Sequence, residues 1–370
     1  MDTQHNFDIF IVASPGLEDI LLNEVIEKGF ANPLVSPGGI TIQGGWSDVW
    51  RANLELRGAT RVLARIGSFM AFHLAQLDKR ARKFPWAQIL RPDVPVRVQV
   101  TTKASRIYHA GAATQRIETA LRESLGATIL PEAALVLKVR IDDNVVTISL
   151  DTSGESLHKR GHKEAVGKAP MRETLAALLL GKAGYRGTET VVDPMCGSGT
   201  FVIEAAEIAL GLNPGRSRQF AFESLASFDA DAFAALRNTA PKSTNLRFFG
   251  SDRDAGAIRM SRANAERAGV SDLTNFENHA AGQLQPPPGG PGLVMVNPPY
   301  GGRIGNKKLL YPLYATLGQT LLDRFKGWRV GLVTSEPPLA KATGLPWQPQ
   351  GAAIAHDGMK VWFYQTPPLR

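Results

Sequence analysis

The segment NPPY, residues 297–300, directly follows an apolar run at residues 293–296. Proline lacks a backbone donor, so a pair of prolines ends the strand that this run predicts. The side-chain carbonyl of Asn297 and the backbone carbonyl of Pro298 are two acceptors in a rigid segment, which suits them to bind both hydrogens of an exocyclic amino group. Such binding favours a pyramidal nitrogen whose lone pair points at the attacked carbon, and Tyr300 offers a ring for base stacking. The alternative is a structural asparagine in a proline-rich loop.

A second segment, DPMCGSGT at residues 193–200, stands between an apolar run and a helical pattern. Gly197 and Gly199 allow a tight turn and a close approach to a ligand beyond the carboxyl end of the strand. The helix that should begin near Thr200 presents free N–H groups there. No Gly-Lys-Ser/Thr follows, as a P-loop requires, and Val202 stands where a dinucleotide motif has its third glycine or alanine. A ligand without pyrophosphate is therefore expected.

Asp252 ends another apolar run, RFFGSD. A carboxylate at the end of the second strand can accept both hydroxyls of an adenosine ribose. The alternative role is the N-cap of a helix that should begin at Ala255, for which Asp254 competes. The gap from Gly199 to Asp252 exceeds 50 residues, so an insertion is expected between these two strands.

Cysteine and histidine offer little further chemistry. Cys196, the one cysteine of the chain, suggests a nucleophile as in pyrimidine C5 chemistry, but its place inside the glycine turn favours a small packing residue. A single cysteine also excludes an internal disulfide framework and a Cys-based zinc site. The seven histidines show no metal-ligand spacing, so no metal site is predicted.

The composition indicates a basic protein with a polyanionic partner. The 370 residues carry a formal net charge of +8 and a pI of about 9.6. This balance favours nucleic acid as a partner, although basic clusters are often only solvated faces. The clusters are residues 79–83, 158–163 and 303–308. No window resembles a transmembrane run and the start lacks the features of a signal peptide, so a cytoplasmic protein is expected.

The first 150 or so residues predict a mixed α+β region. Alternating and apolar runs indicate strands, and apolar spacings of three and four residues indicate helices. Expected strands cover residues 7–14, 40–44, 61–69 and 96–102, with a hairpin over 135–151 that turns at 142–144. Expected helices cover residues 15–30, closed by Gly29, 46–57, with Ser47 as N-cap, and 112–125.

The pattern changes near residue 155, where a polar, glycine-bearing linker begins. After it, residues 171–184 predict a strongly amphipathic helix. Apolar strands then alternate with helices, which indicates a parallel sheet covered on both faces. These strands lie near residues 190–193, 247–252, 293–297 and 329–335, with helices from Thr200, Ala255 and Tyr311 and a terminal hairpin that turns at residues 357–358.

DPMCGSGT, GSD and NPPY together resemble the motifs of class I S-adenosylmethionine-dependent methyltransferases that act on amino groups. Nearly the whole chain also resembles the bacterial RNA guanine-N2 methyltransferases that carry a THUMP domain. The branch that acts on 23S rRNA is the most similar, and a related branch methylates tRNA. The stretches that carry this resemblance include SPGLEDILLNEVIEKGF, WRANLELRGATRVLARIGSF, KFPW, SRIYHAGAATQRI and SLDTSGESLHKRGHKEAVGKAPMRETLAALLL.

The resemblance implies an α/β fold in four parts. Residues 1–48 would form a ferredoxin-like piece, residues 49–155 a THUMP RNA-binding domain and residues 156–168 a linker. Residues 169–370 would form a Rossmann-like methyltransferase domain with a seven-stranded, mostly parallel sheet. S-adenosyl-L-methionine is the implied cofactor and RNA the implied partner, with rRNA ahead of tRNA and a monomer favoured.

The resemblance also assigns residues. The target guanine is expected at Asn297, Pro298, Pro299 and Tyr300. The expected cofactor contacts are Asp193, Pro194, Cys196, Gly197, Gly199, Thr200, Asp252, Arg253, Glu173 and Thr174. The RNA contacts, chosen by motif and charge, are Lys103, Arg106, His109, Lys159, Arg160, Arg303 and Lys307.

Two positions depart from the family pattern. The family has an aspartate after the third strand, where it contacts the adenine amine, but this chain reads ENHAAGQL and offers Asn278, His279 and Ala280. Asn278 is taken as the replacement. The Arg-Gly-Tyr of the family's linker is Arg160-Gly161-His162, which removes an aromatic ring.

An in-line methyl transfer to guanine N2 is expected, with orientation and desolvation supplying most of the rate. DNA adenine-N6 and protein glutamine-N5 methyltransferases share NPPY, but the basic N-terminal half favours RNA. A tRNA guanine-N2 enzyme fits nearly as well as an rRNA enzyme. A non-catalytic RNA-binding or ribosome assembly factor is the alternative of another class.

Overall fold

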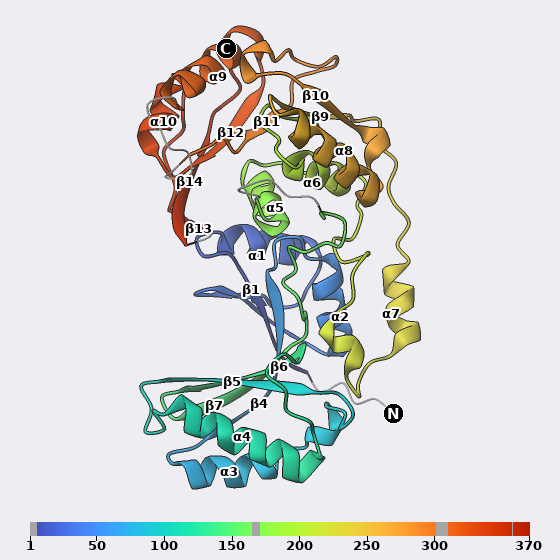
Figure 1. Cartoon of the computed structure of the whole chain (residues 1–370), viewed down its shortest axis with the longest axis vertical. Helices are drawn as coiled ribbons and strands as arrows, with labels where there is room; N and C mark the ends of the chain where they lie inside the picture. The colour runs from blue at the N-terminus through green and yellow to red at the C-terminus, as the bar shows by residue number, and fades with distance from the viewer. Residues whose placement is uncertain (1–5, 165–170, 301–309, 357) are drawn as a thin grey trace. The chain divides into compact units, whose positions relative to one another are not determined.

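The computed structural model describes residues 6–164, 171–300, 310–356 and 358–370 (Figure 1). The chain forms two compact units, each assembled from separate stretches of sequence. The first unit comprises Met1–Ala13, Leu21–Leu157 and Arg218–Asn238, and the second comprises Ser14–Ile20, His158–Ser217 and Thr239–Arg370. Within the described part of the chain, no helix is long and apolar enough to cross a membrane.

The first unit contains a seven-stranded sheet in the order β2-β3-β1-β4-β7-β6-β5. Neighbouring strands are antiparallel except β5 and β6, which pair in parallel. The strands are β1 (Phe7–Val12), β2 (Leu34–Ser36), β3 (Gly39–Gly44), β4 (Arg61–Met70), β5 (Val96–Lys103), β6 (Leu135–Asp142) and β7 (Val145–Asp151). The helices of the N-terminal half are α1 (Glu18–Glu27), α2 (Trp46–Glu55), α3 (Leu74–Arg82) and α4 (Ala110–Leu125), with a 3-10 turn η1 (Trp86–Gln88).

Two turns of this unit test the local predictions. The β6–β7 hairpin is confirmed: Asp143 and Asn144 have φ angles of +48° and +63°, as the tight turns favoured between antiparallel strands require. The prediction that Ser47 caps α2 is wrong, because Gly45 is the N-cap and its N–H donates to the Asp48 carboxylate over 3.0 Å. A carboxylate three residues after the cap can satisfy the helix start without a cap side chain.

The second unit contains a seven-stranded sheet in the order β10-β9-β8-β11-β12-β14-β13. Five neighbouring strands run parallel to one another: β10, β9, β8, β11 and β12. β14 and β13 complete the sheet in antiparallel pairing, so the prediction of a mostly parallel sheet is confirmed. The strands are β8 (Val191–Asp193), β9 (Phe248–Asp252), β10 (Thr274–Asn278), β11 (Leu293–Val296), β12 (Arg329–Thr334), β13 (Ile354–His356) and β14 (Met359–Gln365). The helices are α5 (Glu173–Lys182), α6 (Thr200–Ala209), α8 (Ala255–Ala268), α9 (Leu310–Arg324) and α10 (Pro337–Ala342), with 3-10 turns η3 (Ser271–Leu273) and η4 (Ala281–Gln283).

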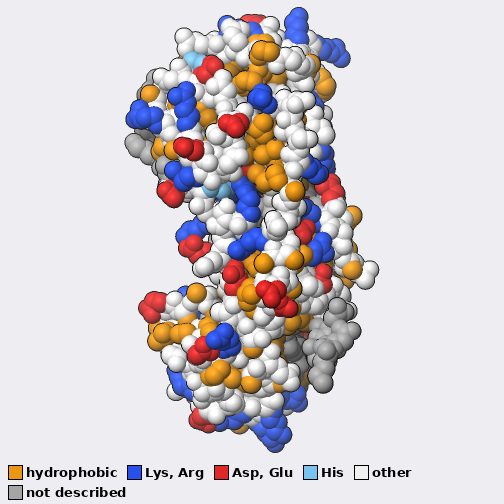
Figure 2. Space-filling view, turned by 90° about the vertical axis from the view of Figure 1, so that its right-hand side faces the viewer, with side chains coloured by type: hydrophobic (Ala, Val, Ile, Leu, Met, Phe, Trp, Pro, Cys, Tyr) orange, Lys and Arg blue, Asp and Glu red, His pale blue; other side chains and the backbone are white. Residues whose placement is uncertain are grey.

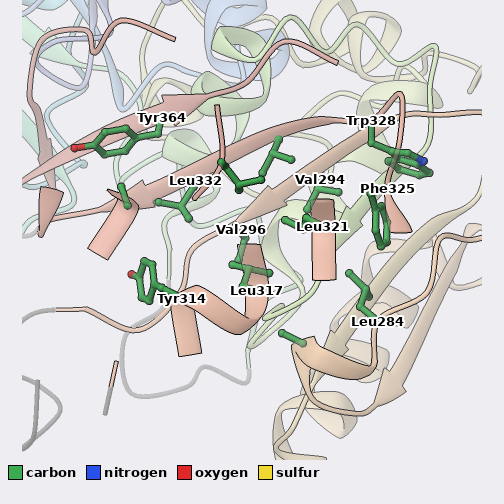
Figure 3. Close-up of a cluster of buried hydrophobic side chains, with 14 of the residues drawn as sticks. Leu284, Val294, Val296, Tyr314, Leu317, Leu321, Phe325, Trp328, Leu332 and Tyr364 are labelled. Atoms are coloured by element: carbon green, nitrogen blue, oxygen red, sulfur yellow. The ribbon is translucent and has the colours of Figure 1, made fainter. Parts of the chain in front are cut away.

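A buried apolar cluster holds β11 and β12 against α9 and α10. All four residues of β11 are buried, as expected for a central parallel strand that is covered on both faces. Figure 3 shows Val294 and Val296 of this strand with Leu317 and Leu321 of α9 in the same cluster. This packing fixes the point at which β11 ends, and therefore the position of Asn297.

The prediction that residues 171–184 form an amphipathic helix is partly wrong. α5 forms, but all eight residues from Glu173 to Leu180 are buried, so the helix has no continuous polar face. Its main neighbour is α6, the helix that follows the glycine turn. The sequence therefore places a glutamate and a threonine, Glu173 and Thr174, in a buried environment.

The expected insertion between β8 and β9 is present. It contains η2 (Ala221–Ser224) and α7 (Ala230–Arg237), and residues 218–238 belong to the first unit. There Phe222 and Phe233 pack around Trp50 of α2, with ring centroids 6.3 and 6.4 Å from that of Trp50. Aromatic burial of this kind explains why an inserted segment joins a different unit from its flanking strands.

Candidate functional site

The glycine turn leads from the carboxyl end of β8 into α6 and contacts the carboxyl end of β9. Gly197 and Gly199 have φ angles of +54° and +84°, which residues with a side chain rarely adopt. The Gly199 N–H donates to the Cys196 carbonyl over 2.8 Å. The Gly197 N–H donates to Asp252 Oδ2 over 3.0 Å. The turn and the second-strand carboxylate, two separate sequence predictions, thus meet at one edge of the sheet.

Asp252 is not the cap of the following helix. Asp254 is the N-cap of α8 and accepts from the Gly256 N–H over 2.7 Å. The carboxylate of Asp252 accepts from Gly197 through one oxygen and from the Asp254 N–H, 2.9 Å away, through the other. A carboxylate has about four acceptor positions, so this arrangement retains capacity for two hydroxyls of a ligand.

Two polar residues of α8, which the sequence analysis missed, donate hydrogen bonds to backbone carbonyls of the glycine turn. Ser261 Oγ donates to the Gly197 carbonyl over 2.8 Å, and Asn264 Nδ2 donates to the Ser198 carbonyl over 3.1 Å. Both side chains are fully buried. Two buried polar residues on the core face of a helix were the available signal, since such groups need partners.

Cys196 serves packing in this turn. Its side chain is buried beside Ser261, with 3.7 Å between Sγ and Oγ. Burial raises the pKa of the thiol far above its usual range. A thiol that stays protonated is a poor nucleophile, so the structure argues against the covalent alternative.

Asp193, at the end of β8, is buried beside the turn. Its Oδ1 accepts from the Met195 N–H over 3.1 Å. Burial, with a smaller contribution from the charge of Asp252, raises the pKa of Asp193 to about 8. Pro194 and Thr200 are also buried, whereas Arg253 is exposed.

The surroundings of the turn have room and an unsatisfied polar group. A Cβ placed on Gly197 would meet no atom within 4 Å. Thr174, in the first turn of α5, is 1% exposed, and its Oγ1 has no hydrogen-bond partner among the described residues. A buried hydroxyl without a partner is costly, so a bound polar ligand is the natural explanation. These features fit a cofactor held between the glycine turn and the start of α5.

The NPPY segment leaves β11 with a buried acceptor in place. Asn297 Oδ1 is inaccessible to solvent and accepts no hydrogen bond within the described residues. The hydroxyl of the buried Tyr314, on α9, donates to the Pro299 carbonyl over 3.2 Å and lies 3.4 Å from Thr334 Oγ1. Pro298 is buried, and the Tyr300 ring packs against the cluster of Figure 3 while staying partly exposed. Tyr314, which the sequence analysis missed, therefore anchors the segment.

The region after β10 gives Asn278 a defined contact. Its Nδ2 donates to the Asp252 carbonyl over 2.8 Å, which fixes the amide beside Asp252. Next to it, a cavity of about 260 Å³ lies against β9 and β10 and is lined by His279, Glu277 and the proline loop 286–288. Ser251 Oγ, also on its lining, is buried without a hydrogen-bond partner among the described residues.

The basic linker differs from its prediction. Arg160 was expected to contact RNA, but its side chain is 1% exposed and lies 3.2 Å from Glu204 Oε1 of α6, so that prediction is wrong. An acidic partner on a packed helix, invisible in the local sequence, draws the guanidinium inward. Lys159 is exposed and stays a predicted RNA contact, whereas the Lys163 side chain is 9% exposed.

Three of the other RNA candidates lie on exposed segments of the first unit. Lys103, Arg106 and His109 are exposed, and His109 Nδ1 also caps α4 by accepting from the Ala112 N–H over 3.2 Å. The Arg106 guanidinium lies 5.5 Å from the centroid of the Phe72 ring. Tyr108, which was not selected from the sequence, is 82% exposed. Arg303 and Lys307 lie outside the described residues.

Within the described residues, no group of three or more His, Cys, Asp or Glu side chains is arranged to hold a metal ion.

Comparison with known proteins identifies the family. Residues 160–349 match the family described as RMKL-like, methyltransferase domain. The chain belongs to this methyltransferase family. Residues 8–63 match the RlmL ferredoxin-like domain, which confirms the ferredoxin-like character expected at the N-terminus. Enzymes of this family use S-adenosyl-L-methionine as methyl donor, in agreement with the fit of the glycine turn and α5 to a bound cofactor.

Relatives extend the similarity over the whole chain. The putative RNA methyltransferase slr0064 of Synechocystis sp. is 30% identical over 91% of this chain and 90% of its own length. The ribosomal RNA large subunit methyltransferase K/L of Chromohalobacter salexigens is 32% identical over 93% of this chain, which spans 50% of that relative's length. SMU.472, a putative methyltransferase solved in complex with SAH, is 26% identical, covers 99% of both chains and has a TM-score of 0.86.

Proposed function

We propose that this protein transfers a methyl group from S-adenosyl-L-methionine to the exocyclic N2 amine of a guanosine in RNA, with 23S rRNA as the substrate. The observation that carries the proposal is the buried Asn297 Oδ1, which has no partner among the described residues. It stands at the end of β11, next to β8 and its glycine turn in the sheet. The names of the relatives, two of which are RNA methyltransferases, support RNA as the substrate.

The cofactor is assigned to the edge formed by β8 and β9. Asp252 would accept the ribose hydroxyls, and Asn278 or the neighbouring Ser251 and His279 would face the adenine. The glycine turn and Thr174 would receive the methionine end, with Asp193 beneath. When bound, S-adenosyl-L-methionine supplies an electrophilic methyl group on a sulfonium.

The chain's own residues would orient the amine. Asn297 Oδ1 and the Pro298 carbonyl each accept one hydrogen of the guanine N2 amine, which turns the nitrogen lone pair toward the cofactor edge. Tyr314 keeps the Pro299 carbonyl in place, so the acceptors are set before the substrate arrives. Pre-set acceptors spend little energy on reorganisation during the reaction. Tyr300 would stack on the guanine.

RNA recognition is assigned to the THUMP region, residues 49–155, and in particular to a tip surface formed by Phe72, Lys103, Arg106 and Tyr108. Asn144 holds this surface together: its carbonyl accepts from the Ala71 N–H and its side chain from the Arg106 N–H, both over 2.9 Å. Exposed aromatic rings beside cations suit unpaired nucleotides, because rings stack on bases while cations meet phosphates. We also propose that the protein acts as a monomer in the cytoplasm, where ribosomal RNA is modified.

The decisive experiment is mass spectrometry of nucleosides from 23S rRNA and tRNA of a deletion strain. Loss of N2-methylguanosine from 23S rRNA, restored by the wild-type gene but not by Asn297→Ala, is the expected result. Loss from tRNA alone would overturn the rRNA assignment. If neither RNA changes and calorimetry detects no S-adenosyl-L-methionine binding, the chain is a non-catalytic RNA-binding factor.

A further inference from the structure

Lys163 occupies an unusual place for a lysine from a basic linker. Its ammonium is 2.7 Å from the Met171 carbonyl, 3.0 Å from Thr200 Oγ1 and 3.4 Å from Glu173 Oε1. An ammonium has three hydrogens, so these three acceptors satisfy it completely. The side chain is 9% exposed and its ion-pair partner Glu173 is 7% exposed. The contact is therefore a buried junction and offers no free charge to RNA.

The three acceptors come from the starts of two helices. Glu173 is the first residue of α5, Met171 stands just before it, and Thr200 is the first residue of α6, directly after the glycine turn. The next residue of α5, Thr174, carries the buried hydroxyl without a partner. Lys163 thus ties together the two elements between which the methionine end of the cofactor is assigned.

Stability alone does not account for a lysine here. Burial lowers the pKa of Lys163, and Glu173 opposes that effect. The positive ends of two helix dipoles add to the cost of a cation at this point. Replacing a buried ion pair with apolar side chains is often neutral or stabilising, so stability is a weak explanation for this pair. The geometry that the pair fixes is the alternative explanation.

We propose that Lys163 is a positioning residue that holds the first turns of α5 and α6 at the separation required by the amino-acid end of S-adenosyl-L-methionine. The inference rests on the cofactor site proposed above. It assigns to the linker a part in cofactor recognition, and it explains why one lysine of the basic cluster at residues 158–163 is turned inward. The contribution is selective, because the adenosine end of the cofactor is assigned to the ends of β9 and β10, which Lys163 does not hold.

The test compares two ligands by calorimetry in wild type, Lys163→Met and Lys163→Arg. S-adenosyl-L-methionine has the amino-acid end, and 5′-methylthioadenosine lacks it. Lys163→Met should lower the affinity for S-adenosyl-L-methionine by about tenfold or more, equivalent to the loss of one well-placed contact. The affinity for 5′-methylthioadenosine should change by less than about twofold. Lys163→Arg keeps the charge but not the compact geometry, and should give a smaller selective loss. Arg216→Met, which breaks the pair with the buried Glu207 further along α6, is the control. It should change the affinity for neither ligand.

The outcomes separate this inference from the proposed function. If the wild type binds neither ligand, the cofactor site itself is wrong. If the wild type binds both but Lys163→Met weakens them equally, or weakens neither, Lys163 is only structural and the inference fails. Should Lys163→Met not fold, as judged by circular dichroism, the selectivity of Lys163→Arg decides, because that variant keeps the ion pair.

Discussion

At the scale of single residues, two of the buried polar atoms without partners among the described residues stand at the proposed sites. Asn297 Oδ1 and Thr174 Oγ1 are both inaccessible, and neither has a hydrogen-bond partner among the described residues. Each such group costs about 1–3 kcal/mol in the ligand-free protein. One stands at the proposed amine site and the other at the proposed cofactor site, so the two costs would be recovered when substrate and cofactor bind.

Asn297→Ala should separate catalysis from cofactor binding. Removing one pre-set acceptor is expected to lower the rate of single-turnover methylation by about 10²–10³-fold, since the acceptor acts on the reacting amine. The dissociation constant for S-adenosyl-L-methionine, measured by calorimetry, should stay within about twofold. The melting temperature should not fall, because Asn297 Oδ1 accepts no hydrogen bond from the described residues. Equal losses of rate and affinity would make Asn297 a structural or cofactor-binding residue instead.

Gly197→Ala tests whether the space at the glycine turn receives a ligand. The new methyl group would enter space that is empty within 4 Å, at a φ of +54°. The backbone strain should cost about 1–2 kcal/mol of unfolding free energy. Cofactor affinity should fall by about tenfold or more, a loss of at least ~1.4 kcal/mol, because the methyl group occupies the ligand's place.

Gly269→Ala is the matched control for that variant. Gly269 ends α8 with a φ of +71°, and a Cβ there also meets no atom within 4 Å. It should show the same strain in chemical denaturation with unchanged cofactor affinity. Comparable affinity losses in both variants would mean that strain, and not ligand space, is responsible.

The elevated pKa of Asp193, about 8, predicts a pH dependence of stability. In the unfolded chain this carboxyl titrates near 4, so between pH 4 and pH 8 the unfolded state ionises while the folded state stays protonated. The contribution of Asp193 is fully present below pH 4 and is lost as the pH rises to about 8. Asp193→Asn should therefore gain unfolding free energy relative to wild type across this window, by up to ~1.4 kcal/mol per pH unit.

Urea denaturation of the cofactor-free protein at several pH values measures this difference. Asp272→Asn, at an exposed position, is the control and should follow the wild type. A constant difference between Asp193→Asn and wild type from pH 5 to pH 8 would contradict a raised pKa.

At the scale of elements, local patterns predicted most of the fold and long-range contacts decided the rest. β11 was predictable because a strand buried on both faces is apolar at every position. The glycine turn was equally visible, but its support from Ser261 was not, since more than 60 residues separate the two. Arg160 was misassigned for the same reason: only the packed structure brings Glu204 opposite it.

Tyr314→Phe tests how α9 supports the NPPY segment. The variant loses the hydroxyl that donates to the Pro299 carbonyl, and a buried hydrogen bond of this kind contributes about 1 kcal/mol to stability. We expect a similar loss in unfolding free energy, together with about a tenfold lower methylation rate because the neighbouring acceptors lose their fixed position.

Tyr185→Phe supplies the comparison for Tyr314→Phe. The Tyr185 hydroxyl donates to the carbonyl of Ala205 on α6 over 2.9 Å and is similarly buried. Its loss should lower stability without slowing the reaction of the folded enzyme. If both variants slow the reaction equally, general destabilisation explains the effect and Tyr314 has no special role in positioning.

At the scale of the whole molecule, the net charge of +8 does not by itself define where RNA binds. Lys and Arg side chains form several separate groups on the face shown in Figure 2, interspersed with acidic residues. The basic group at residues 158–163 of the linker is partly buried. Another, at residues 79–83, lies at the C-terminal end of α3, with Lys83 as the C-cap. Charge alone therefore contributes general attraction, and specific binding needs rings and cations placed together, as at the tip surface.

Tyr108→Ala and Arg106→Ala should weaken RNA binding in different ways. The loss of a stacking ring should cost about 1–3 kcal/mol for an unpaired oligonucleotide and little for a duplex, because paired bases cannot stack on it. The loss of the Arg106 charge should lower the slope of log affinity against log salt concentration by about one, whereas Tyr108→Ala should leave the slope unchanged.

Leu34→Ala, at another exposed apolar residue of the first unit, is the control and should have no effect. Fluorescence anisotropy from 50 to 200 mM salt measures both quantities, and cofactor affinity should stay constant throughout. Equal weakening by all three variants would show that the tip surface has no specific part in RNA recognition, and that diffuse charge is sufficient.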